Sequence, residues 1–187
     1  SESAGPVKWI SKKSIELFAY LLMHRGRNVS KARILEHIFP DMPEKNAAIY
    51  LNTAVYQIRK ALHPHGHRNI LVSSQEQYWL LIDELEADFI LFEERLQQFS
   101  SIHVRNIEQA LACEQLFTGE LFEDRSYVWS VSEQIRLHDL YNCFTKQLSR
   151  WLLAHDRTEQ AAGLIKKLVL RNELDEESNY LLLQAYA

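Results

Sequence analysis

The order of its periodic segments limits most strongly what this chain can fold into. Three amphipathic helices are expected first, at residues 12–24, between Ser30 and Pro40, and at about 44–62. Ser11 and Ser30 precede the first two segments as N-caps. Two short β-branched and aromatic runs, 70–72 and 78–82, follow around a polar stretch and predict a β-hairpin. Three helices followed by a hairpin are typical of a winged helix-turn-helix.

Beyond residue 83 every long segment has helical periodicity. Five helices are expected, and the small residues Ala161 and Ala162 favour stacked helical hairpins over a single bundle. The predicted fold is therefore mainly α with a small β-hairpin wing. We expect a winged-helix domain at residues 1–83 and an all-α repeat domain at residues 84–187.

The net charge of −4 conceals a division between the two halves. Residues 1–82 hold 11 Lys and Arg against 6 Asp and Glu, a net +5, and the remaining residues carry −9. Lys and Arg supply most non-specific affinity for nucleic acid by neutralising phosphates. The first half is therefore expected to meet a polyanion such as double-stranded DNA, and the second half to be repelled by it.

The third helix has an apolar stripe, expected at Ala48, Leu51, Val55, Ile58 and Leu62. The opposite face of this helix is polar. Asn and Gln can bond adenine edges, Thr and Ile can contact a thymine methyl, and Tyr and Lys suit phosphate. Any surface helix has such a face, so a solvated surface is the alternative. The candidate DNA-binding residues on this face are Asn46, Ile49, Tyr50, Thr53, Gln57 and Lys60, with Arg59 on its flank as a phosphate contact.

A second group of cations surrounds the start of the second helix, where helix N-termini and basic side chains commonly bind phosphate. Ordinary solubility charge is the alternative reading. The candidates are Arg25, Arg27, Lys31 and Arg33, together with Arg68 before the hairpin.

Other function classes find little support. Cys113 and Cys143 are too few for a disulfide framework or a cysteine metal site, which fits a reducing cytoplasm. His63, His65 and His67 could suggest zinc, but no Cys or carboxylate lies beside them, so a loop is the better account. The chain lacks a glycine-rich phosphate loop, G-x-S-x-G and HExxH, and no apolar run reaches the length of a membrane span. We expect no enzyme, no cofactor and a cytoplasmic location.

Residues 8–62 resemble the OmpR-type winged helix of SARP-like regulators, and the second half is similar to the bacterial transcriptional activator domain (BTAD) that follows it there. Residues 156–175 resemble a tetratricopeptide repeat. The segments that carry the resemblance are Glu16–Leu22, Asn28–Lys31, Ile34–Pro40, Val55–Leu62, Ala87–Phe89, Phe92–Glu93, Ala110–Leu111, Leu116–Leu121, Trp129, Glu133 and Arg136–Leu137.

This resemblance implies a DNA-binding transcriptional activator, with RNA polymerase and a second copy of the chain as further candidate partners. Such output modules often follow a receiver domain in response regulators. The chain begins without Met and ends within the apolar stretch Leu181–Tyr186, so we expect the output fragment of a larger signal-responsive regulator. The alternative is a helical-repeat adaptor for proteins or peptides, whose winged helix does not bind DNA.

The sequence departs from this family pattern at three places. Only Pro6–Ile10 precede the first helix where strands are usual, Gln77 stands where the wing usually has glycine, and Glu173 replaces a common repeat proline. The glycine departure bears on the geometry of the wing turn. Two interpretations of Trp129 stay open: it fills the core, or it is an exposed anchor for a partner.

Overall fold

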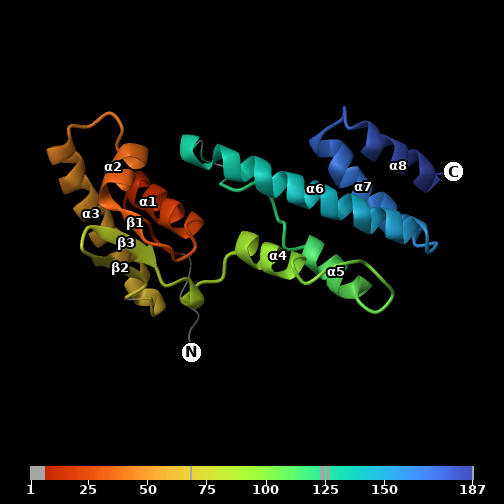
Figure 1. Cartoon of the computed structure of the whole chain (residues 1–187), viewed down its shortest axis with the longest axis horizontal. Coiled ribbons are helices and arrows are strands. Elements are labelled where there is room, and N and C mark those ends of the chain that lie inside the picture. The colour runs from red at the N-terminus through yellow and green to blue at the C-terminus, as the bar shows by residue number, and fades with distance from the viewer. Residues whose placement is uncertain (1–6, 68, 123–124, 126, 187) are drawn as a thin grey trace. The chain divides into compact units, whose positions relative to one another are not determined.

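The computed structural model describes residues 7–67, 69–122, 125 and 127–186. The chain divides into two compact units, Ser1–Glu86 and Ala87–Ala187 (Figure 1). The expected mainly helical fold with a small antiparallel sheet is confirmed. In the part of the chain that the structure describes, no helix has the length and apolar character needed to cross a bilayer.

In its described residues, the first unit contains three helices and a three-stranded sheet. The helices are α1 (Lys12–Met23), α2 (Lys31–Ile38) and α3 (Glu44–Leu62), and the strands are β1 (Val29–Ser30), β2 (Leu71–Ser74) and β3 (Gln77–Leu80). The antiparallel sheet has the order β1-β3-β2, so β3 pairs with both neighbours. Short 3-10 turns occupy His63–His65 and Ile82–Glu84. The strand β1 is too short to give an alternating pattern and was not expected from the sequence.

Both predicted serine N-caps are confirmed. Ser11 Oγ accepts from the Ser14 N–H at 3.1 Å, and Ser30 Oγ accepts from the Arg33 N–H at 3.3 Å. Each bond satisfies an N–H that the first helical turn would otherwise leave without a partner. These bonds fix where α1 and α2 begin.

The buried stripe of α3 differs by one position from the expected one at its N-terminal end. Ala47 is buried and Ala48 is only half-buried, whereas Leu51, Val55, Ile58 and Leu62 are buried as expected. The additional alanines Ala54 and Ala61 are also buried, so Ala47, Leu51, Ala54, Ile58 and Ala61 follow the i, i+4, i+7 spacing of a helix face. This face belongs to the core of the first unit, in which α3 packs against α1.

The wing turn is tighter than the polar stretch 73–77 suggested. β2 extends to Ser74 and β3 begins at Gln77, leaving only Gln75 and Glu76 in the turn. Their φ angles are +49° and +58°, the left-handed region that a two-residue type I′ hairpin requires. The turn therefore forms without the glycine that usually relieves this strain.

The second unit is all-helical in its described residues. It contains α4 (Asp88–Leu96), α5 (Ile107–Glu114), a 3-10 turn (Val128–Ser130), α6 (Val131–Leu153), α7 (Thr158–Arg171) and α8 (Glu176–Tyr186). Each helix packs against the next, and α8 also contacts α6 (Figure 1). Ala161 and Ala162 are buried within the core, as expected for small residues between neighbouring helices.

A polar cluster around a buried carboxylate joins α5, α6 and α7. Glu114 is only 2% exposed, and its carboxylate accepts from Tyr141 Oη at 2.6 Å and from Lys167 Nζ at 2.9 and 3.1 Å. Arg171 lies over the rings of Phe117 and Tyr141, 4.7 and 4.5 Å from their centroids. Burial, and then the bond to Glu114, raise the pKa of Tyr141 well above its ordinary value. This cluster links three helices through one carboxylate.

Trp129 lies between the two alternatives that the sequence left open. It is half-buried, stacks on Tyr127 with ring centroids 5.0 Å apart, and meets the ring of Phe122 edge-on at 5.8 Å. Trp129 therefore belongs to a small aromatic cluster that precedes α6.

Candidate nucleic-acid interface

The exposed face of α3 brings together most of the residues on this helix that were expected to meet DNA bases or phosphates. Asn46, Ile49, Tyr50, Thr53 and Lys60 are all exposed, with Ile49 at 60%. The Thr53 hydroxyl donates to the Ile49 carbonyl at 3.0 Å. Because that proton is used within the helix, Thr53 is better suited to offer its methyl group than a donor.

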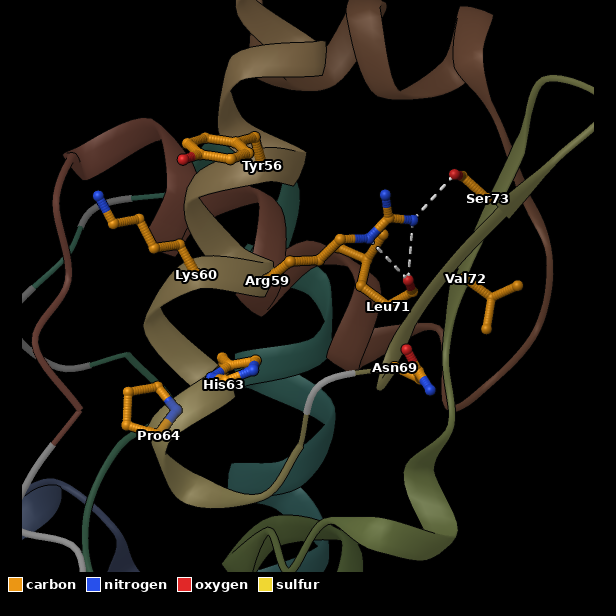
Figure 2. Close-up of a pocket in the computed structure, with 9 residues that line it drawn as sticks. All are labelled: Tyr56, Arg59, Lys60, His63, Pro64, Asn69, Leu71, Val72 and Ser73. Carbon is orange, nitrogen blue, oxygen red and sulfur yellow. Dashed lines mark hydrogen bonds between the residues drawn. The ribbon is translucent and has the colours of Figure 1, made fainter.

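Two other candidates on α3 are held by contacts within the first unit. Gln57 is half-buried, and its Oε1 accepts from Ser11 Oγ at 2.6 Å. Arg59 donates from Nε and Nη2 to the Leu71 carbonyl at 3.2 and 3.0 Å, and from Nη2 to Ser73 Oγ at 3.0 Å (Figure 2). Gln57 thus connects α3 to the start of α1, and Arg59 connects α3 to β2.

A hollow of about 850 Å³ lies between the C-terminal half of α3 and strand β2. Figure 2 shows Arg59 reaching across toward Leu71 and Ser73, while Tyr56 and Lys60 extend from α3 on the side away from the strand. Cations, an amide and a hydroxyl on one concave surface suit an anion such as a phosphate. The lining residues are Tyr56, Arg59, Lys60, His63, Pro64, Asn69, Leu71, Val72 and Ser73.

The expected phosphate contacts around α2 have different environments. Arg27 and Arg33 are exposed, whereas Arg25 is half-buried with a φ of +50°. Lys31 Nζ lies 2.8 Å from Glu76 Oε1, and this bond raises the pKa of Lys31 above its ordinary value. Arg68 lies outside the described residues.

Three residues of this surface were not predicted. Asn52 and Tyr56 are exposed on α3, Tyr56 at 64%, and Glu76 stands at the wing tip. Tyr56 follows Thr53 by three positions and precedes Lys60 by four, so helical spacing alone could have found it. The contact of Glu76 with Lys31 joins residues 45 positions apart and has no local signal in the sequence.

Comparison with known families agrees with this geometry. Residues 6–78, less than half of the chain, match a family model described as "Transcriptional regulatory protein, C terminal". No curated protein matches the chain. That family is a DNA-binding regulatory domain and not a catalytic one. The first unit therefore contains a winged-helix DNA-binding domain of the OmpR type, as found in transcriptional regulators.

Proposed function

We propose that this chain is a sequence-specific transcriptional regulator that inserts α3 into the major groove of double-stranded DNA. The observation that carries the proposal is the exposed face of α3, where Asn46, Ile49 and Thr53 stand one helical turn apart in succession. A helix with its side chains is about 10–12 Å wide, and the major groove is about 12 Å wide.

Each side chain of this face suits a distinct contact. Asn46 can bond the N6 and N7 edge of adenine, and Ile49 and Thr53 can pack on a thymine methyl. Tyr50, Tyr56 and Lys60 flank these positions and suit phosphate oxygens. Gln57 and Arg59 are assigned a supporting role instead, because Ser11, Leu71 and Ser73 already hold them.

The cations around α2 are proposed to fix the register of the domain on the duplex. Arg27 and Arg33 are exposed, and Arg25, Lys31 and Arg68 add charge to the same half of the chain. Phosphate contacts of this kind position the protein without reading sequence. They also predict an affinity that falls steeply with salt.

The second unit is proposed to receive or transmit a regulatory signal. Its charge of −9 beyond residue 82 argues against a DNA-binding role, and its helices pack in succession as in helical-repeat scaffolds. The similarity to SARP-like regulators and their BTAD module supports an activator in the cytoplasm, forming the output part of a larger response regulator. RNA polymerase and a second copy of the chain are the proposed protein partners.

Selection of bound sequences from random DNA with the purified chain tests this function. The proposal predicts enrichment of one motif, and binding of that motif that weakens steeply between 50 and 200 mM salt, by about 10³-fold or more for six or more phosphate contacts. A folded chain that enriches no sequence and binds no duplex would instead favour the helical-repeat adaptor.

A further inference from the structure

The tip of the wing places a carboxylate against the first turn of α2. Glu76 Oε1 lies 2.8 Å from Lys31 Nζ, and the Lys31 N–H donates to the Glu76 carbonyl at 2.8 Å. We infer, on the basis of the proposed function, that Glu76 sets the affinity of the DNA interface by competing with a DNA phosphate for the Lys31 ammonium. In the free protein, the Glu76 carboxylate would then occupy the place at Lys31 that a DNA phosphate takes in the complex.

The position of Lys31 makes a phosphate the expected competitor. Lys31 is the first residue of α2, the helix that precedes α3 in the helix-turn-helix, and exposed Arg27 and Arg33 lie within four residues of it. In this motif the helix before the recognition helix crosses the DNA backbone. A cation at its N-terminus is therefore placed to meet a phosphate.

The backbone donors at this helix end are already partly used. The Lys31 N–H bonds the Glu76 carbonyl, and the Arg33 N–H bonds Ser30 Oγ. Phosphate recognition here must then depend more on side chains than on free N–H groups. The charge of Lys31 therefore contributes more to phosphate binding at this helix end, and so does the Glu76 carboxylate that neutralises it.

The wing turn fixes the backbone of Glu76 next to Lys31. Gln75 and Glu76 form a two-residue turn between paired Ser74 and Gln77, and the Glu76 carbonyl is bonded to Lys31 independently of the side chain. Neutralising the carboxylate should therefore leave the wing tip where it is. Glu76→Gln is a nearly isosteric variant that removes the negative charge alone.

The exposure of the pair makes it displaceable. The side chain of Glu76 is 74% exposed and that of Lys31 is 31% exposed, so water and salt screen their attraction. A phosphate can replace such a partner at modest cost. Removing the competitor should raise affinity by about two- to fivefold, the range expected for an exposed ion pair.

The test measures binding of the full chain to a random-sequence 24-base-pair duplex by fluorescence anisotropy, from 50 to 200 mM salt. Glu76→Gln should bind about two- to fivefold more tightly at 50 mM salt, and this advantage should shrink toward 200 mM, because salt screens the Lys31–Glu76 attraction that the wild-type chain must give up. Glu36→Gln, which neutralises an exposed acid on α2, the helix of Lys31, controls for net charge. In a Lys31→Met background, Glu76→Gln should gain no more than Glu36→Gln does.

Three outcomes separate the inference from the proposed function. If the wild-type chain binds DNA with a steep salt dependence but Glu76→Gln matches Glu36→Gln, the competition is refuted and DNA binding stands. If Glu76→Gln gains fully without Lys31, the competitor acts elsewhere and the inference also fails. If the wild-type chain binds no duplex, the proposed function fails and takes the inference with it. Thermal melting of each variant confirms that it is folded.

Discussion

The single residues of α3 that were expected to meet DNA fall into two groups. Some face solvent, and others make contacts that hold the first unit together. Thr53 and Lys60 are exposed on α3, whereas Gln57 is half-buried and bonded to Ser11. The sequence placed all three on one polar face, because a helical wheel shows direction but not the partner that a side chain meets. The bond from Ser11 comes from a residue 46 positions away.

Substitutions on α3 should therefore have three different effects. Thr53→Ala should reduce the preference for the selected duplex over a scrambled one by about 1 kcal/mol, the scale of one lost methyl contact with a base. Lys60→Ala should weaken binding to both duplexes by the same factor.

Gln57→Ala should mainly lower the free energy of unfolding, by about 1 kcal/mol, through loss of the Ser11 bond. Anisotropy titrations with both duplexes and urea unfolding distinguish these effects, and an equal loss of base preference in Thr53→Ala and Lys60→Ala would contradict the assignment.

The wing turn gives a stability prediction. Gln75 adopts a φ of +49°, and asparagine occupies this region more readily than glutamine. Gln75→Asn should raise the free energy of unfolding of the first unit by about 0.5–1 kcal/mol, a gain that urea denaturation can measure. Gln77→Asn, a matched change in a strand, should give no such gain, and equal effects at both positions would argue against turn strain.

At the scale of elements, the polar cluster of α5, α6 and α7 predicts a dependence on pH. Tyr141 has a pKa raised above its ordinary value near 10 by burial and by Glu114, so the folded state favours the protonated phenol. Its contribution to stability is complete below that value and is lost as the pH rises above it, where the unfolded chain releases the proton first. Tyr141→Phe should lower the free energy of unfolding by about 1.5–3 kcal/mol near neutral pH, because the hydrogen bond of the phenol to the Glu114 carboxylate is lost.

The matching measurement is urea unfolding of the wild-type chain and Tyr141→Phe between pH 8 and 11. The difference in unfolding free energy between the two should shrink above about pH 10. Tyr180→Phe, at an exposed tyrosine of α8, serves as the control and should show a small effect at every pH. A difference for Tyr141→Phe that stays constant through pH 11 would show that burial does not hold this phenol protonated.

Local signals explain which elements could be predicted from the sequence. Ser11 and Ser30 cap their helices through residues three positions away, and the stripes of α3 and α7 repeat with helical period, so these elements follow from neighbouring residues. β1 has two residues and exists through pairing with β3, about 48 positions later. Its formation, the ties of Arg59 to β2 and the contact of Lys31 with Glu76 depend on tertiary structure, which periodicity cannot show.

For the molecule as a whole, we propose that the basic half binds DNA and that the acidic, helical half receives or transmits the regulatory signal. The charges of +5 and −9 on either side of residue 82 support that division, and the family match covers only the basic half. The selected duplex should therefore be recognised through the first unit. Substitutions in the second unit, such as Glu159→Gln on the exposed side of α7, should leave DNA affinity nearly unchanged.

Sequence-specific recognition by α3 can be measured as the ratio of two affinities of the purified chain at fixed salt, one for its selected duplex and one for a scrambled duplex. We expect a preference of about 10³-fold or more, as specific DNA-binding proteins show. Asn46→Ala should remove part of this preference and leave the scrambled duplex bound as before. Equal affinity for both duplexes, or no affinity for either by the folded chain, would contradict sequence-specific DNA recognition by α3.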